Sequence, residues 1–411
     1  MENGFAQNKF DNGSVKHIVV KTKELCCGCS ACANACPKKC IKMHFDDEGF
    51  LYPKVDSSRC IECGLCTKVC PIQNPSHLKD EIPLSYVVQN KNSHVRKEST
   101  SGGMFSVLAE YVLAKQGIVF GAAYDDNFVV KHIDIESIED LYKLRGSKYV
   151  QSEIGATFHK AKEYLENGRW VCFSGTPCQI AGLKNFLKKD YEKLLLVDIV
   201  CHGTPSPMLF RTYVEYHTKM NGPLKNIYFR NKEFGYAGST MALEFQSGKK
   251  RFTGQDVHFF KESFFRDLST RPSCYQCKFK YINRVSDFTL FDCWSVNTFK
   301  KEMDDDKGTT SVLIHSQKGQ NIFDELSDKI EGVQVDFELL KKDSGSMLEG
   351  RIKMNPLRDD FFKDAASFTI PEMVKKYTPL TMKKRCIQTV KPLLNKFKVL
   401  HLIKRKVGKL L

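Results

Sequence analysis

Apolar and polar residues follow a regular alternation from residue 84 to about residue 330. Apolar runs of strand length alternate there with segments of helical period, which is typical of βαβ units and a parallel sheet. The pattern predicts strands over 84–89, 169–173, 193–200 and 311–315, a strand pair over 118–124 and 128–135, and helices over 104–116, 153–167, 176–187, 207–220 and 319–330. Mixed β structure is expected over 224–252.

The chain before residue 84 forms a smaller unit. Alternation on both sides of the turn Asp46-Asp47-Glu48-Gly49 predicts a β-hairpin. The segment 74–83, NPSHLKDEIP, has the composition of a linker. The pattern therefore predicts two bodies, a small one and a larger one with the parallel sheet.

Eight cysteines in the small unit form the motif C-x2-C-x2-C-x3-C-P twice. This is the spacing of bacterial two-cluster ferredoxins, in which three thiolates of one motif and the fourth of the other bind each [4Fe-4S] cluster. A zinc site fits less well, since it wants four ligands with longer gaps between pairs. The predicted ligand sets are Cys26, Cys29, Cys32 with Cys70, and Cys60, Cys63, Cys66 with Cys36.

Four further cysteines lie at informative places in the larger body. Cys178 follows one predicted strand and Cys201 follows the next, so both thiols are expected at the carboxyl edge of the sheet if the strands are parallel neighbours. Cys274 and Cys277 add a C-x2-C pair. The four fit a third [4Fe-4S] cluster, but spacing alone leaves zinc and simple packing open. The remaining cysteines, Cys27, Cys40, Cys172, Cys293 and Cys386, have no partner pattern and are taken as structural.

The segment Thr100-Ser101-Gly102-Gly103 precedes a predicted helix. Glycines and a helix N-terminus suit the phosphates of a flavin, the usual converter between one-electron and two-electron transfer. Arg145 and Lys148 offer cationic partners for a pyrophosphate. Residue chemistry alone favours the simpler interpretation that Thr100 or Ser101 caps the helix.

Composition indicates the cellular compartment and excludes nucleic acid as a partner. Seventeen cysteines without a secretory signal pattern indicate metal ligation in the cytoplasm. No apolar run approaches the roughly 18 residues that span a bilayer. The net charge of +15 is local, because residues 379–411 hold ten Lys/Arg and no acid. We therefore expect no nucleic-acid partner. The tail has the pattern of a basic amphipathic helix, suited equally to packing on the body or to the inner membrane surface.

Six motifs in the same order resemble the coenzyme F-420 (deazaflavin) hydrogenase/dehydrogenase beta-subunit family, in its version with an N-terminal two-cluster ferredoxin domain. They are Thr100–Gly103, Arg145–Tyr149, Phe173–Gln179, Asp198–Gly203, Cys274-x2-Cys277 and the segment from Arg284 to Trp294. The resemblance implies FAD at Thr100, Ser101, Gly102, Gly103, Arg145 and Lys148, with Asp287 near the flavin or a cluster, and favours the third cluster. The segment departs from the family pattern at Phe291, Cys293 and Ser295.

The expected fold is α/β, or α+β overall, with four regions. Residues 21–75 form a two-cluster ferredoxin-type domain, 82–165 a flavin-contacting region, 166–345 a C-terminal domain with the extra cysteines, and 346–411 a basic helical tail. The resemblance implies an FAD and iron–sulfur oxidoreductase that exchanges electrons with a small-molecule substrate or a deazaflavin or nicotinamide carrier. A ferredoxin or another redox protein is the expected partner.

Two points stay open from the sequence alone. His202, beside Cys201, is the best-placed proton donor for a reduction, although a histidine hydrogen-bonded near a cluster is the simpler interpretation. The alternative function is a non-catalytic electron-transfer subunit of a larger redox complex.

Overall fold

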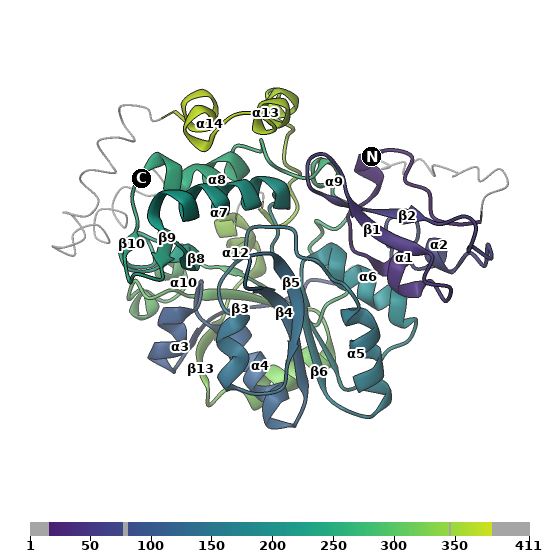
Figure 1. The fold of residues 1–411 in the computed structure, drawn as a ribbon. Helices are drawn as coiled ribbons and strands as arrows, with labels where there is room; N and C mark the ends of the chain where they lie inside the picture. Colours follow the sequence, from purple (N-terminus) through teal and green to yellow (C-terminus); the bar gives the residue numbers. More distant parts are fainter. Residues whose placement is uncertain (1–15, 77–80, 345–346, 380–411) are drawn as a thin grey trace, which may run out of the picture.

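The computed structural model describes residues 16–76, 81–344 and 347–379, and Figure 1 shows two bodies. The small N-terminal unit lies beside a larger body built on one long sheet. The expected α/β class, with a ferredoxin-like unit before a larger mixed sheet, is confirmed. The predicted basic helix of the tail lies outside the described residues.

The small unit wraps two short helical turns around a hairpin. Its elements are η1 (Lys23–Leu25), α1 (Ala31–Ala35), β1 (Ile41–Phe45), β2 (Leu51–Val55) and α2 (Leu65–Lys68). β1 and β2 pair antiparallel, as predicted, from Ile41 with Val55 to Phe45 with Leu51. The Asp46 carboxylate closes the turn by accepting the Phe50 N–H at 2.8 Å. Each helix follows a residue with left-handed φ, Ser30 before α1 and Gly64 before α2, so the two cysteine motifs fold alike.

The large sheet has a parallel centre and antiparallel margins. Its order is β13 (Ile330–Gln334), β3 (Leu84–Asn90), β12 (Thr310–Ile314), β11 (Phe288–Asp292), β7 (Leu194–Ile199), β6 (Val171–Gly175), β4 (Ile118–Tyr124) and β5 (Val130–Ile135). The strands β4, β6, β7 and β11 are parallel neighbours. The strands before Cys178 and Cys201, β6 and β7, are parallel neighbours, so the condition for finding both thiols at one edge of the sheet is met.

Helices cover this sheet and bury its apolar side chains. They include α4 (Met104–Ala114), α5 (Thr157–Glu166), α6 (Pro177–Leu187) and α11 (Gln317–Glu325). Thr176 and Gln179 form a capping box at the start of α6, which fixes the turn between β6 and the helix. The helix predicted over 319–330 ends earlier, at Glu325, because Ile330 turns into the core and begins the edge strand β13.

A second layer stands at the carboxyl ends of the parallel strands. The antiparallel sheet β8 (Leu224–Asn231), β9 (Thr240–Phe245) and β10 (Lys250–Arg251) packs there with α7 (Pro207–Asn221), α8 (Gln255–Phe265), α13 (Arg358–Ala365) and α14 (Ile370–Tyr377). Buried aromatic rings, among them Phe210, Tyr213 and Phe260, hold this layer together. The sequence pattern missed α8.

Short segments complete the described chain. They are α3 (Ser93–Glu98), η2 (Glu139–Lys143), α9 (Pro272–Tyr275), α10 (Val296–Phe299), η3 (Lys301–Met303) and α12 (Phe337–Ser344). Within the described ranges, none of the helices has both the length and the apolar character needed to cross a bilayer.

Candidate iron–sulfur and cofactor sites

The first predicted ligand set, named here the inner set, comprises Cys26, Cys29, Cys32 and Cys70. The structure brings these four thiols together: Cys32 interacts electrostatically with Cys26 and Cys70, and Cys29 interacts with Cys32 and Cys70. Burial raises the pKa of Cys32 far above its ordinary value, and the neighbouring thiolates raise it further. The inner set is therefore a group of two buried and two partly exposed thiols, whose thiolate forms would repel one another.

The second predicted set, the outer set, comprises Cys36, Cys60, Cys63 and Cys66. All four line one cavity at the far end of the small unit. Backbone N–H groups point at two of the sulfurs, from Ile18 to Cys66 at 3.2 Å and from Glu62 to Cys60 at 3.4 Å. Such donors stabilise a thiolate. Cys40, which we took as structural, also lines the cavity, with its sulfur 3.3 Å from that of Cys36.

The third set comprises Cys178, Cys201, Cys274 and Cys277. Cys178 lies in the first turn of α6 and Cys201 two residues beyond β7, while α9 supplies Cys274. Cys201 interacts electrostatically with the other three, so the structure brings these four thiols to one place. Burial, with the repulsion of the neighbouring thiolates, raises the pKa of Cys274 to about 12.

Chemistry tests whether a cluster fits these places. Buried thiols that repel one another stay protonated unless a cationic centre stands among them, and the irons of a [4Fe-4S] cluster provide one. Among the described residues, no group of three or more His, Cys, Asp or Glu is placed to hold a single metal ion. A cluster needs wider spacing, because each thiolate binds a different iron. The three sets suit clusters.

The inner set and the third set meet at α6. Gly182 of α6 packs so closely on Cys29 that a Cβ there would lie 3.0 Å from its sulfur. Between the two sets lies Cys27, whose thiol interacts with those of Cys29 and Cys178 and has its pKa raised. Sequence reasoning set Cys27 aside because its spacing matches no motif, and only the fold reveals its place.

Arg271 is a buried cation at the same junction. Its guanidinium donates to the Cys26 carbonyl at 2.9 Å, to the Leu51 carbonyl at 3.0 Å and to Gln151 Oε1 at 3.0 Å. It also lies 4.1 Å from the Tyr52 ring centre. The residue is 1% exposed and pairs with no carboxylate in the described part of the chain. An uncompensated buried cation between two thiol sets fits anionic groups on both sides.

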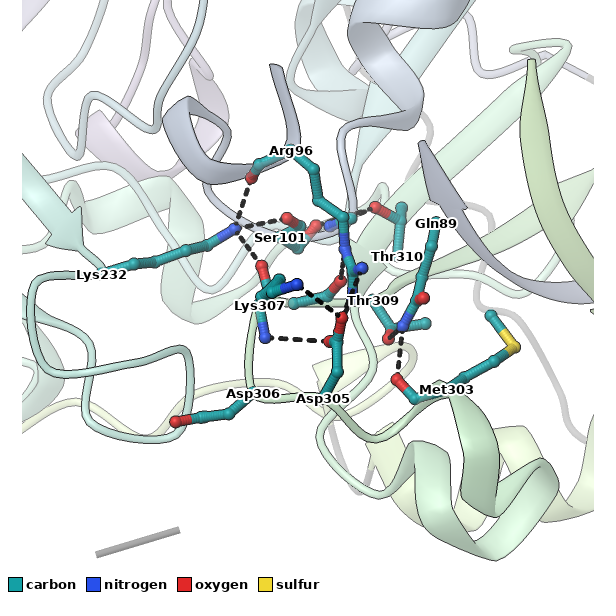
Figure 2. Close-up of polar contacts among 12 residues, drawn as sticks. Gln89, Arg96, Ser101, Lys232, Met303, Asp305, Asp306, Lys307, Thr309 and Thr310 are labelled. Atoms are coloured by element: carbon teal, nitrogen blue, oxygen red, sulfur yellow. Dashed lines mark hydrogen bonds and ion pairs between the residues drawn. The ribbon is translucent and has the colours of Figure 1, made fainter. Parts of the chain in front are cut away.

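The predicted flavin loop, Thr100 to Gly103, is bound to the rest of the body by its own hydrogen bonds (Figure 2). The Gly102 N–H donates to Thr310 Oγ1 at 2.9 Å, and the Ser101 hydroxyl lies 2.9 Å from the same oxygen. The Thr100 hydroxyl accepts the Ser147 N–H at 2.9 Å. A Cβ on Gly102 would lie 2.4 Å from the Val88 carbonyl, so close backbone packing requires this glycine.

Lysines with depressed pKa values flank this loop. Lys232 donates to the carbonyls of Arg96 at 2.9 Å, Ser101 at 2.6 Å and Lys307 at 2.8 Å, and Figure 2 shows its ammonium group among them. Burial lowers the pKa of Lys232 to about 7. Burial likewise lowers the pKa of Lys148 to about 7, and its ammonium donates only to carbonyls among the described residues. Both lysines would gain from a nearby anion.

Arg96 and Arg145 already have partners. Arg96 forms a two-bond pair with Asp305, at 2.8 and 2.5 Å, which ties α3 to the loop before β12. Arg145 donates to the Ser106 hydroxyl of α4 at 3.1 Å and lies 4.0 Å from Glu110. Arg145 therefore stands at the first turns of α4.

An aromatic and cationic wall, which sequence reasoning missed, lies at the carboxyl end of β11. Asp292 accepts from Arg230 at 2.8 Å and from the Tyr236 hydroxyl at 2.9 Å. The ring of Tyr236 stacks on that of Trp294, with centroids 4.7 Å apart, and Arg230 lies 4.6 Å over the same indole. Trp294 is 45% exposed. The signal in the sequence was the Asp-x-Trp segment, but its partners on β8 and the following loop come from the fold.

Two predicted residues lie apart from this wall. Asp287 comes directly before β11, at the start of the strand. Asp292 is at the opposite end of β11, where it pairs with Thr310, the residue that contacts the flavin loop. The Asp287 carboxylate accepts from the Leu196 N–H at 2.9 Å and from Ser316 at 2.5 Å, so the structure does not bring it to the flavin loop. His202 lies 2.7 Å from Asp267 and packs edge-on against Phe264; burial lowers its pKa.

Comparison with known proteins gives two family matches. Residues 168–336 match the C terminus of the coenzyme F420 hydrogenase/dehydrogenase beta subunit, and residues 25–74 match a 4Fe-4S dicluster domain. Among curated proteins, the chain is 26% identical over 185 residues to a coenzyme F420-dependent sulfite reductase of Methanocaldococcus jannaschii, covering 44% of this chain. It is 31% identical over 108 residues to a polyferredoxin-like protein of the same organism, covering 21% of this chain.

The chain spans only 28% and 62% of the lengths of these two relatives. One chain of a solved structure, the F420-reducing [NiFe] hydrogenase complex from Methanosarcina barkeri, aligns with this protein. The alignment covers 67% of this chain and 92% of the chain in that structure. The identity is 16% and the TM-score 0.46.

Proposed function

We propose that the chain is an iron–sulfur flavoprotein oxidoreductase. Two family matches support this proposal: residues 168–336 match the C terminus of coenzyme F420 hydrogenase/dehydrogenase beta subunits, and residues 25–74 match a 4Fe-4S dicluster domain. The chain passes electrons between [4Fe-4S] clusters and FAD, and so reduces a two-electron carrier or a small-molecule substrate. The observation that best supports the proposal is the contact between the small unit and the body at α6. There the inner set contacts the body through Cys29, Cys27 and Arg271.

Each cysteine set has its own part in this proposal. The inner and outer sets hold the two clusters of the small unit, and the third set holds one cluster in the body. Such clusters supply one-electron transfer. The chain's own contribution is to bring the inner set and the third set together at α6, which packs on Cys29 and carries Cys178. The Arg271 guanidinium offsets the negative charge that two reduced clusters would bring to this buried place.

We place FAD at the carboxyl edge of the sheet, between the flavin loop and the aromatic wall. FAD supplies the conversion between one-electron and two-electron transfer. The ammonium groups of Lys148 and Lys232, with the N-terminus of α4, suit a pyrophosphate. The exposed ring of Trp294 offers an apolar face for a flavin ring. Ser101, Gly102 and Gly103 shape this edge through the backbone contacts described above.

The proton for the substrate is assigned to His202. A reduction at carbon needs a proton donor within reach of the reacting atom. Asp267 accepts from, and so orients, the His202 ring, and the imidazole lies one residue from Cys201. The substrate proposed first is a deazaflavin, since the sulfite reductase relative is named for its dependence on coenzyme F420. The domain limits 21–75, 82–165, 166–345 and 346–411 are part of the same proposal.

A single-turnover experiment tests this function. We expect dithionite to reduce the clusters of the wild-type protein first and the flavin absorbance near 450 nm to bleach after them. Replacing Cys201 with alanine should leave the small unit reducible but slow flavin bleaching by at least about tenfold, because the third set is lost. The matched control is Cys172→Ala, a buried cysteine on β6 outside all three sets.

Three results would count against the proposal or narrow it. Flavin bleaching at the wild-type rate in the Cys201 variant would remove the third set from the path. A purified chain that binds no flavin would leave iron–sulfur electron transfer alone. Normal bleaching without turnover of any deazaflavin, nicotinamide or sulfite acceptor would support the electron-transfer subunit instead.

A further inference from the structure

The outer set opens to solvent, whereas the inner set is enclosed by the body. Cys63 is exposed, and the neighbouring Ile61 is 57% exposed. In contrast, Cys29 and Cys32 are buried, and Cys29 faces α6. The thiols of the small unit therefore run from a solvent-facing edge to the junction with the third set. An outside electron donor can approach the chain closely at the outer set.

The rim of this edge is basic. Lys16 and Lys38 line the cavity of the outer set, and Lys39 follows Lys38 along the chain. The Arg59 guanidinium donates to the Lys38 carbonyl at 3.0 Å, which fixes it beside Cys60. All four side chains are exposed, and Arg59 interacts electrostatically with the carboxylate of Asp56.

Two acids, Asp56 and Glu62, lie close to this rim. Residues 16–76 hold nine Lys/Arg and six Asp/Glu in all, so the whole unit is basic as well. The acids Asp46 and Glu48 are already paired with Lys23 and Arg358. The free charge at the open edge is therefore predominantly positive.

We propose that this rim is the docking surface for an acidic one-electron carrier protein. The inference rests on the proposed function and adds the place of electron entry and the charge of the partner. In each encounter one electron leaves the reduced carrier and enters the chain at the outer set, with no bond formed or broken and no proton moved. Ile61 supplies the apolar centre of the contact, and the lysines and arginine form its rim.

Electrostatic steering gives this surface a measurable signature. A positive rim attracts an acidic carrier and raises the association rate by about 10–1000-fold, and salt screens the attraction. A small contact of this kind releases the carrier quickly after transfer, as in other weak redox encounters. The rate of reduction should therefore depend on ionic strength and on the charge of the rim.

The test measures the second-order rate at which a reduced acidic two-cluster ferredoxin reduces the cluster-loaded protein. We expect the wild-type rate to fall about tenfold or more as salt rises from about 0.05 to 0.5 M. The triple variant Lys16→Glu, Lys38→Glu and Arg59→Glu should lose about tenfold at low salt and most of its salt dependence. Reduction by methyl viologen, a small donor that needs no docking, should stay within about twofold of wild type in every variant.

A matched variant reverses three charges elsewhere. Lys97 in α3 and Lys249 between β9 and β10 are exposed residues of elements on the opposite side of Figure 1 from the small unit, and Lys219 is exposed near the C-terminal end of α7. Changing them to glutamate should leave the ferredoxin rate within about twofold of wild type. Equal slowing by both triple variants would show a net-charge effect and overturn the docking surface.

A wild-type rate that is independent of salt would overturn the inference by itself. If the rim variant fails to load iron, the single variant Lys38→Glu and the wild-type salt series decide the question. Failure of the proposed function looks different, because the wild-type chain would then lack clusters or flavin, or methyl viologen would reduce the clusters without bleaching the flavin.

Discussion

Replacing Arg271 with methionine should loosen the small unit from the body. The change removes three charge-assisted hydrogen bonds and leaves the carbonyls of Cys26 and Leu51 and the Gln151 amide oxygen without their donor. Each buried acceptor left unsatisfied costs about 1–3 kcal/mol, and water entering the gap restores part of it. We expect a loss of about 3–6 kcal/mol, a large share of the roughly 5–15 kcal/mol by which domains are stable.

The assay is anaerobic thermal unfolding of the cluster-loaded protein at one fixed scan rate. A loss of this size should lower Tm by at least about 6 °C. Potentiometric titration should show lower cluster potentials, since a positive charge beside the reduced form is lost.

Two further variants separate charge from geometry. Arg271→Lys keeps the charge but loses the planar fork, so the potentials should stay closer to wild type than the stability does. Arg211→Met removes an arginine that is 69% exposed on α7, and its Tm should stay within about 2 °C of wild type. A Tm and potentials for Arg271→Met equal to those of wild type would refute the role of Arg271 at the junction.

Three other changes have defined outcomes. Cys201→Ala should lower bound iron by about four per chain, while Cys172→Ala leaves it unchanged in the same iron assay. Burial lowers the pKa of Lys148 to about 7 in the free protein, and a bound anion would raise it, so FAD affinity should fall by up to about tenfold per pH unit above pH 7. Isothermal titration should show a flatter profile for Lys148→Met. Glu48→Ala should lower the free energy of unfolding by about 3–5 kcal/mol, because the Arg358 guanidinium loses the carboxylate to which it donates two hydrogen bonds, and its side chain is only 5% exposed. Thermal unfolding measures this loss, and a Tm equal to wild type would contradict the reasoning.

Local chemistry made much of this fold predictable. The hairpin at Asp46–Gly49 and the strands before Cys178 and Cys201 have short-range signals, namely a turn between alternating residues and apolar runs before a capped helix. The cysteine spacing also predicted which thiols meet, because the motif itself sets how three sulfurs converge. In these cases a few neighbouring residues determine the geometry.

Contacts between distant segments were not predictable in the same way. Arg271 and Cys27 look ordinary in the sequence, yet one is 245 residues from its partner Cys26 and the other interacts with Cys178 of the distant helix α6. The mixed margins of the sheet depend on β13, a strand with one buried residue at its start and a weak pattern. Asp287 was expected near the flavin or a cluster by resemblance, but the register of β11 and β12 puts it at the opposite end of β11 from Asp292 and the flavin loop.

Iron, sulfide and flavin analysis of the anaerobically purified protein tests the central claim most directly. The account predicts about twelve irons, about twelve acid-labile sulfides and one FAD per chain, because three sets of four cysteines each hold one [4Fe-4S] cluster. Eight irons with one zinc and no flavin would contradict it.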